Sequence, residues 1–331
     1  MSEQLIDKFN RVVDYVRISV TDRCDFRCVY CMAEDMVFAP RSEILTLEEV
    51  ELIARAFVEL GVAKIRLTGG EPLVRKGIVG LVENLAKLDG LKELNMTSNG
   101  SQLPTLAQPL KDAGLDRLNI SLDSLQADRF KALTRTGNLD TVLTGIQSAK
   151  QAGFKRIKLN AVVLKGQNDD EIIDLIEFIR SNELDISFIE EMPLGQIDHH
   201  DREQTFIDSA YIQGVIEQSH HMKPIDDTSG GPSRYWGFSD GHKSRVGFIS
   251  PHSHNFCGTC NRVRVTAKGQ LLLCLGNEHS VDLKAVVRQY PDDLEPLKNV
   301  IREAMMIKPE RHDFDLAQDV QILRFMNTTG G

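Results

Sequence analysis

The chain has 331 residues, of which 41% are hydrophobic, so it is long enough to bury a large core in one domain or two. Its 48 acidic residues exceed its 39 basic ones, and the net charge of −9 disfavours a role in coating nucleic acid or an anionic membrane. The polar amino terminus, MSEQLIDKFN, and the lack of any apolar run of about 18 residues predict a soluble, cytoplasmic protein.

The first half of the chain alternates short strand-like runs with helix-like runs. The strand-like runs are centred near residues 17, 66, 95, 119, 158 and 187, and helical stretches such as 46–60 and 169–180 lie between them. This alternation predicts parallel βαβ units. Six units fall short of a complete eight-unit barrel of about 250 residues, so we predict an incomplete (β/α)6 barrel of the TIM type.

Five of these strands are apolar on one face and polar on the other. In the first, Val16 and Ile18 alternate with Arg17, and the fourth places Asn119, Ser121 and Asp123 on its polar face. Parallel strands covered on both sides are usually apolar throughout, and burying polar groups is unfavourable unless they bind something. We therefore expect a barrel lumen that holds a large polar ligand. An antiparallel sheet with one solvated face is the alternative, although the intervening helical runs favour crossovers.

The pattern is irregular over residues 193–233, and short strand-like runs then follow at 234–238, 245–250, 262–266 and 270–274. The AKGQ segment between the last two runs predicts a hairpin turn, and helices are expected over 281–289 and 294–306. We predict a barrel region over 1–195 and a second region over 196–331 that closes the barrel mouth.

The six cysteines form two groups of three, and this grouping in a large chain without a secretory signal favours metal binding over disulfides. Cys24, Cys28 and Cys31 follow the first strand with C-x3-C-x2-C spacing, and three thiolates can hold three irons of a 4Fe–4S cluster, leaving one iron open. Structural zinc is the alternative, although no histidine precedes His199 in the chain. For the second group (Cys257, Cys260 and Cys274), zinc with a nearby histidine (His252, His254 or His279) competes more strongly.

The C-x3-C-x2-C motif with Tyr30 before its last cysteine, together with TGGEP at 68–72, resembles the radical S-adenosylmethionine (SAM) enzymes. Further segments extend the resemblance, from about residue 9 to 331, to the GTP 3′,8-cyclase family, also called the molybdenum cofactor biosynthesis protein A family. These segments are RISVTDRCDFRCVYCM, NISLDSL, KLNAVVLKGQND, FIEEMPLG, FCGTCNRVRVT and the terminal GG. The chain departs from the pattern at Asp25 and Ala33, where we expect Asn and Pro, and in the NTT before the double glycine.

This resemblance implies a set of site residues. It implies that both cysteine groups bind 4Fe–4S clusters, and that Tyr30, Gly70, Ser121 and Met192 contact SAM. It also implies that GTP is bound by Arg17, Arg66, Thr97, Lys158, Arg262, Val263 and Arg264. Arg17, Arg262, Arg264 and the terminal Gly330 and Gly331 are implied to be catalytic. Independently of the resemblance, the five cations among these residues would offset a triphosphate of about −4.

The resemblance also implies the reaction: a 5′-deoxyadenosyl radical from SAM removes H3′ of GTP, and C3′ then bonds to C8 of guanine. The product enters molybdenum cofactor biosynthesis through cyclic pyranopterin monophosphate synthase, and a flavodoxin or ferredoxin is the expected electron donor. Homodimerisation is left open. Two alternatives also remain open from the sequence: a radical SAM peptide maturase and a zinc-stabilised scaffold.

Overall fold

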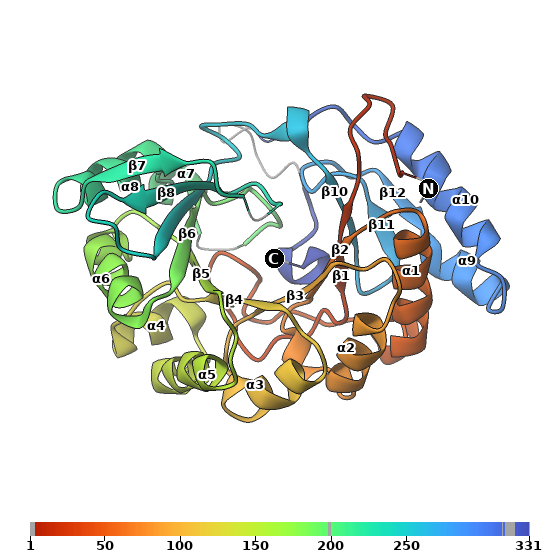
Figure 1. The fold of residues 1–331 in the computed structure, drawn as a ribbon, viewed down its shortest axis with the longest axis horizontal. Coiled ribbons are helices and arrows are strands. Elements are labelled where there is room, and N and C mark those ends of the chain that lie inside the picture. Colours follow the sequence, from red (N-terminus) through yellow and green to blue (C-terminus); the bar gives the residue numbers. More distant parts are fainter. Residues whose placement is uncertain (1–3, 198–199, 229, 313, 315–321, 331) are drawn as a thin grey trace.

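The computed structural model describes residues 4–197, 200–228, 230–312, 314 and 322–330. Its first six strands occur at every expected position and pair in parallel in chain order, so the antiparallel alternative is wrong. These strands are β1 (Tyr15–Ser19), β2 (Lys64–Thr68), β3 (Glu93–Ser98), β4 (Arg117–Ser121), β5 (Ile157–Val162) and β6 (Asp185–Ile189). Figure 1 shows them as a curved sheet, which confirms the partial barrel.

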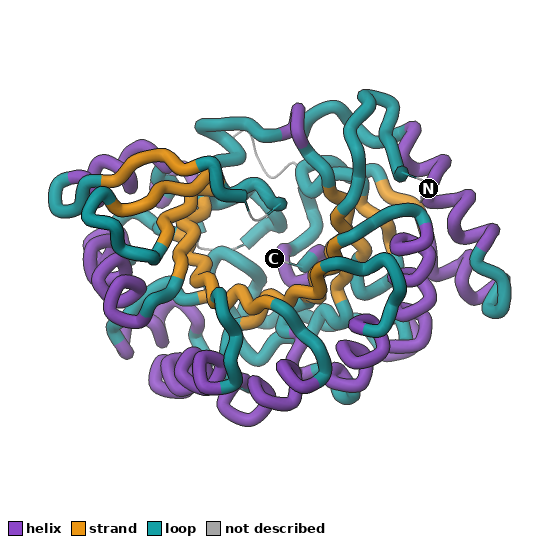
Figure 2. Tube along the Cα trace, in the orientation of Figure 1, coloured by secondary structure: helices purple, strands orange, loops and turns teal. Residues whose placement is uncertain are grey.

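Helices lie on the outer side of this curved sheet, as Figure 2 shows. Those of the barrel are α1 (Leu47–Glu59), α2 (Ile78–Ala86), α3 (Leu103–Asp112), α4 (Ala127–Thr134), α5 (Leu139–Gln151) and α6 (Ile172–Asn182). The first shows why the sequence forms them. The Thr46 side chain accepts a hydrogen bond from the Glu49 N–H at 3.1 Å, and the Glu49 carboxylate accepts one from the Thr46 N–H at 2.8 Å. This reciprocal cap begins α1, whose Ile53 and Phe57 are then fully buried.

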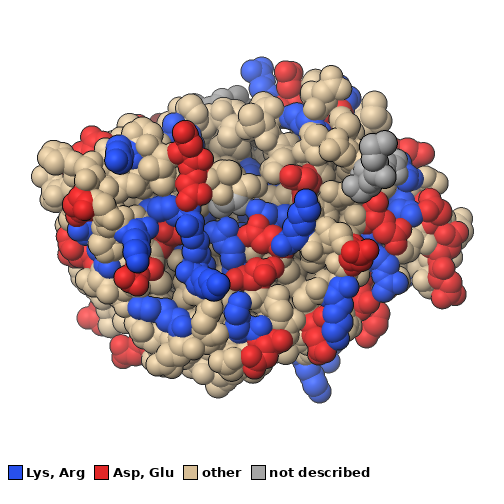
Figure 3. Space-filling view, in the orientation of Figure 1, with Lys and Arg blue, Asp and Glu red and all other residues tan. Residues whose placement is uncertain are grey.

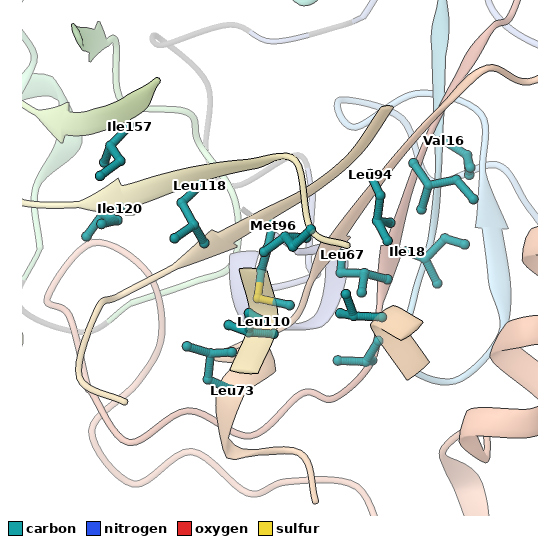
Figure 4. Close-up of a cluster of buried hydrophobic side chains, with 14 of the residues drawn as sticks. Val16, Ile18, Leu67, Leu73, Leu94, Met96, Leu110, Leu118, Ile120 and Ile157 are labelled. Carbon is teal, nitrogen blue, oxygen red and sulfur yellow. The ribbon is translucent and has the colours of Figure 1, made fainter. Parts of the chain in front are cut away.

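The apolar sides of the strands pack against these helices. Val16, Ile18, Leu67, Met96 and Leu118 are each 0% exposed, and Figure 4 shows them with Leu110 of α3 in one cluster. Each such side chain contributes about 1.5–3 kcal/mol relative to an exposed position. The alternation seen in the sequence therefore leaves the other side of each strand facing the lumen.

The carboxyl-terminal half extends the same sheet at both edges. β9 (Arg245–Ile249) pairs in parallel with β6, and β10 (Arg262–Val265) pairs in parallel with β1. Antiparallel strands then continue outward: β8 (Arg234–Phe238) and β7 (Met222–Ile225) beyond β9, and β11 (Gln270–Leu272) and β12 (Ser280–Asp282) beyond β10. Strands from both parts of the chain belong to one sheet, and the sheet does not mark where one domain ends. The domain boundary at residue 195 therefore stays a prediction.

The remaining helices are α7 (Arg202–Thr205), α8 (Ser209–Glu217), α9 (Leu283–Gln289), α10 (Glu295–Met306) and α11 (Met326–Thr329). The sequence did not reveal α7, α8 or β7 in the irregular 193–233 region. The run expected to be a strand over 270–274 leaves the sheet after Leu272, so Cys274 lies in the loop beyond it. The expected hairpin between β10 and β11 is present.

Candidate active site

A cavity inside the curved sheet is lined by the polar sides of the parallel strands, as the alternation predicted. Its lining includes Tyr15, Arg17, Arg66, Thr97, Asn119, Ser121, Asp123, Lys158 and Asn160. Figure 3 shows Lys and Arg side chains gathered near the centre of the molecular face that it displays.

The two cysteine groups border this one cavity from opposite ends of the strands. All six thiols are among its lining residues. Cys24, Cys28 and Cys31 follow the end of β1, whereas Cys257 and Cys260 precede the start of β10, which runs parallel to β1 with Arg262 beside Tyr15. Cys274 reaches the same end because β11 runs back antiparallel to β10. β1 itself spans roughly 13 Å, so the strand interior separates the two groups.

The first cysteine group is held by its own loop. Cys31 N–H donates to the Cys28 carbonyl at 3.0 Å, and Phe26 N–H donates to Cys24 Sγ at 3.3 Å. Burial raises the pKa of all three thiols, that of Cys31 to about 12. A positively charged metal centre would offset this penalty by stabilising the thiolates. The donor set therefore fits iron held by thiolates.

Among the described residues, no three His, Cys, Asp or Glu side chains are placed to hold a single metal ion. A 4Fe–4S cluster distributes its protein ligands over several irons, so its thiolates need not converge on one point.

The TGGEP segment is attached to the loop that carries the first cysteines. Gly70 N–H donates to the Thr21 carbonyl at 2.8 Å, and a Cβ on Gly70 would lie 2.5 Å from the Arg23 carbonyl oxygen. Glu71 is 0% exposed, and its carboxylate accepts from Asn99 N–H at 2.6 Å. Burial raises the pKa of Glu71 to about 7, although its hydrogen bonds oppose that shift. The glycines thus allow a close approach that any side chain would block.

Tyr30, Ser121 and Met192, which the family resemblance assigns to SAM, also line the cavity, as does Gly70. The Tyr30 hydroxyl donates to Asp123 Oδ2 at 2.7 Å. Burial raises the pKa of Asp123 to about 6, and the hydrogen bonds from Val162 N–H and Tyr30 oppose the shift. The four residues therefore lie in the same cavity as the first cysteine group.

The five predicted cations all line the cavity. The sheet register places Arg264, Arg17 and Arg66 side by side on β10, β1 and β2. Burial and the neighbouring Arg66 and Arg262 lower the pKa of Arg17 to about 10, while Tyr15 opposes the shift. Burial also lowers the pKa of Arg264, helped by Arg17 and Arg262. The buried Arg17 Nε has no hydrogen-bond partner among the described residues, so an anionic ligand would satisfy it.

The other residues assigned to GTP lie around this row of arginines. Thr97 Oγ1 accepts from Arg66 Nη1 at 3.4 Å, and Lys158 Nζ lies 3.4 Å from the Tyr235 hydroxyl. Burial lowers the pKa of Lys158, and Tyr235 opposes the shift. Val263 borders the cavity, but it is only 1% exposed. Strand alternation turns its side chain away from that of Arg262, so contact with a ligand would use its backbone.

Tyr15 is a lumen residue that the sequence reasoning missed, although it shares the parity of Arg17. It is 4% exposed, and its hydroxyl accepts from Arg66 Nε at 2.6 Å. Burial alone would raise the pKa of Tyr15, but Arg66, Arg17 and Arg262 outweigh burial and lower it to about 7. The Tyr15 oxygen therefore accepts a hydrogen bond among the cations, and these cations favour its deprotonated form.

Arg11 and Lys308 donate hydrogen bonds to the second cysteine group, and no sequence motif had indicated either residue. Arg11 Nη1 donates to the Cys257 carbonyl at 2.8 Å, and its Nη2 donates to the Pro309 carbonyl at 2.7 Å. Asp7 Oδ2 accepts from Arg11 Nε at 2.6 Å. Lys308, which is 2% exposed, places Nζ 3.7 Å from Cys260 Sγ.

The carboxyl-terminal segment enters the lumen, where Figure 1 shows the C-terminus inside the curved sheet. Asn327 Nδ2 donates to the Asp22 carbonyl at 2.9 Å, and Arg264 Nη1 donates to the Gly330 carbonyl. Gly330 has φ +76°, and a Cβ there would overlap Thr68 Oγ1. Gly331 lies outside the described residues. The described part of the tail thus runs from the loop of the first cysteines to the row of arginines.

Asp25, one of the departures from the family pattern, is well accommodated. Its Oδ1 accepts from Asn99 Nδ2 at 2.7 Å, and its Oδ2 accepts from Ser101 Oγ at 2.6 Å. The carboxylate therefore ties the loop of the first cysteines to the end of β3.

Fold and site together define a class of protein. Residues 18–179 match the Radical SAM superfamily, which implies SAM and a 4Fe–4S cluster, and residues 184–314 match Molybdenum Cofactor Synthesis C. Two relatives are the GTP 3′,8-cyclases of Pseudomonas putida strain W619 and Marinobacter nauticus. Each is 62% identical, over 100% and 99% of this chain respectively and 99% of the relative. The chain belongs to the GTP 3′,8-cyclase family.

Solved structures support the fold. Streptococcus suis SuiB bound to S-adenosylmethionine matches with a TM-score of 0.63 and 16% identity, covering 97% of this chain and 79% of that one. SuiB bound to precursor peptide SuiA matches with a TM-score of 0.61 and 18% identity, covering 89% and 68%. At this identity the likeness concerns the fold alone. Within the described residues, none of the helices has the length and apolar character needed to cross a bilayer.

Proposed function

We propose that the protein converts GTP to (8S)-3′,8-cyclo-7,8-dihydroguanosine 5′-triphosphate, the first step of molybdenum cofactor biosynthesis. One observation carries the proposal. Two groups of three thiols border one cavity from opposite ends of its strands, and a row of buried or half-buried arginines lies between them. Membership of the cyclase family supports the same reaction.

We assign one 4Fe–4S cluster to Cys24, Cys28 and Cys31, and a second to Cys257, Cys260 and Cys274. When bound, the first cluster and SAM would supply a 5′-deoxyadenosyl radical, using one electron from an external reductant. Transfer of H3′ from the ribose would give 5′-deoxyadenosine, C3′ would then bond to C8 of guanine, and one further electron and a proton would complete the 7,8-dihydro product. The remaining task of the polypeptide is to bind, orient and shield the reactants.

The chain's own residues would divide that task along the lumen. Tyr30, Gly70, Ser121 and Met192 lie in the cavity with the first cysteine group and would hold SAM. GTP would lie between the groups, held by Arg17, Arg66, Thr97, Lys158, Arg262, Val263 and Arg264. This placement would bring the ribose toward SAM and the base toward the second cysteine group.

Charge supports an anionic substrate. Five cations line the cavity, whereas Asp123, the carboxylate among the described lining residues, accepts a hydrogen bond from Tyr30. Arginine forks suit the oxygens of a triphosphate, and burial strengthens such contacts. The triphosphate would favour the charged forms of Arg17 and Arg264, whose pKa values burial lowers.

The tail would complete the site. Arg264 donates to the Gly330 carbonyl, so the tail and a substrate phosphate would use neighbouring parts of one guanidinium. We propose that Gly330 and Gly331 position Arg264 and exclude water, and that their removal abolishes cyclisation while SAM cleavage continues.

For the partners, we propose a flavodoxin or ferredoxin as electron donor and cyclic pyranopterin monophosphate synthase as the enzyme that takes the product. The acidic net charge of −9 supports a protein that binds neither nucleic acid nor an anionic membrane. We also propose that the protein is cytoplasmic. Sizing chromatography of the holoprotein would establish whether it forms a homodimer.

The deciding experiment is anaerobic incubation of the reconstituted protein with SAM, GTP and dithionite, followed by mass analysis. We expect the cyclised nucleotide, and we expect 5′-deoxyadenosine to form faster with GTP than with ATP. GTP-independent formation of 5′-deoxyadenosine, without any cyclised product, would favour a peptide maturase and contradict the proposal.

A further inference from the structure

Lys308 is a buried cation, and no carboxylate among the described residues compensates its charge. It follows α10 and is 2% exposed, so its ammonium group has lost nearly all contact with water. Among the described residues, its side chain has one hydrogen-bond partner, Cys260 Sγ at 3.7 Å, and no carboxylate pairs with it. A buried charge is unfavourable unless an opposite charge compensates it.

The segment that carries Lys308 is fastened to the second cysteine group by Arg11. The Arg11 guanidinium donates to the carbonyls of Cys257, Pro309 and Glu310 at 2.8, 2.7 and 2.6 Å. Asp7 holds the same guanidinium through Nε. Through Arg11, the two residues after Lys308 are tied to Cys257, and this attachment holds Lys308 next to the second cysteine group.

We propose that Lys308 is a positioning residue that sets the reduction potential of the second cluster through its charge next to Cys260. The proposal rests on the assignment of that cluster made above. Reduction adds one negative charge to the cluster and its thiolates, and a buried ammonium beside one sulfur stabilises the reduced form more than the oxidised form. Local charge and hydrogen bonds to sulfur are established determinants of such potentials.

The test is an EPR-monitored redox titration of full-length reconstituted protein. Every sample carries Ala in place of Cys24, Cys28 and Cys31, so that only the second cluster contributes to the EPR signal. Lys308→Met keeps the side-chain length and removes the charge, whereas Lys308→Arg keeps the charge. Lys268→Met removes an exposed lysine, whose side chain is 52% accessible, and serves as the matched control.

We expect Lys308→Met to make reduction about tenfold less favourable, which corresponds to a potential lower by about 59 mV for one electron. Lys308→Arg and Lys268→Met should remain close to the parent. An unchanged potential in Lys308→Met, or an equal shift in Lys268→Met, would overturn the inference.

If Lys308→Met protein retains no iron, the Lys308→Arg variant shows whether the positive charge at this position is what matters. A retained cluster with the parent's potential supports the role of charge, and loss of the cluster in that variant as well overturns it. A parent protein without any second-cluster signal would instead refute the cluster assignment itself.

Discussion

The substitution Gly330→Ala tests whether the docked tail is needed for cyclisation. Gly330 has φ +76°, where a residue with a Cβ loses about 1–2 kcal/mol. The new Cβ would also overlap Thr68 Oγ1 and lie 2.7 Å from Thr68 Cβ, and such overpacking adds about 1–3 kcal/mol. The sum, about 2–5 kcal/mol, lowers the ratio of docked to undocked tails by about 30-fold or more. Undocking also removes the bond from Arg264 to the Gly330 carbonyl.

The assay measures both products of one anaerobic reaction with SAM, GTP and dithionite. We expect the rate of cyclised nucleotide formation to fall about tenfold or more, while 5′-deoxyadenosine still forms. Gly214→Ala is the matched control, because a Cβ at Gly214 meets nothing within 4 Å. Wild-type cyclisation by Gly330→Ala protein, at an unchanged melting temperature, would refute this reasoning.

Three further substitutions test the rest of the lumen. Arg17→Lys should weaken GTP binding about 10- to 100-fold in equilibrium dialysis, because charge-assisted bonds to phosphate are worth about 1.5–3 kcal/mol; unchanged GTP affinity would remove Arg17 from the substrate site. Tyr15→Phe removes a phenol whose pKa is lowered to about 7, chiefly by Arg66 acting against burial. Because the phenol has a lower pKa in the folded protein, its contribution to stability is complete above the unfolded pKa of 10.0 and is lost as pH falls through 7. Urea unfolding at pH 7, 8 and 9 should therefore show that the free energy of unfolding rises less steeply with pH in Tyr15→Phe than in the parent. Equal slopes would contradict the pKa shift. Gly70→Ala places a Cβ 2.5 Å from a loop carbonyl and should lower SAM affinity and iron content, whereas Gly80→Ala, where a Cβ meets nothing within 4 Å, should not; matching losses in both proteins would argue against a specific role for Gly70.

The barrel strands and the polar lumen were predictable because both follow from local alternation. Arg17 and Asn119 each lie between two apolar residues along their strands. Because successive side chains of a strand point to opposite faces, this alternation places both side chains on the lumen face. Tyr15 has the same parity and could have been predicted with them. The register that places Arg264 beside Arg17 was not predictable from local pattern, because it depends on a pairing between distant segments.

The attachment of β9 and β10 to the two edges of the barrel was also beyond the sequence pattern. Their alternation predicts strands, but it does not specify partners. Lys308 is a similar case: it lies at the end of a helix, 48 residues from Cys260, and only the folded chain brings the two together. The cysteine spacing predicted metal binding, whereas the location of the two groups at opposite ends of one cavity required the structure.

The most direct test of the account counts iron and sulfide in anaerobically reconstituted protein and records EPR spectra after reduction. We predict about eight irons per chain. We also predict about four when Cys24, Cys28 and Cys31 are replaced by Ala, and about four when Cys257, Cys260 and Cys274 are replaced, with a distinct reduced-cluster signal in each variant. A wild-type protein that holds only four irons, or that holds zinc at the second cysteine group, would contradict the central claim.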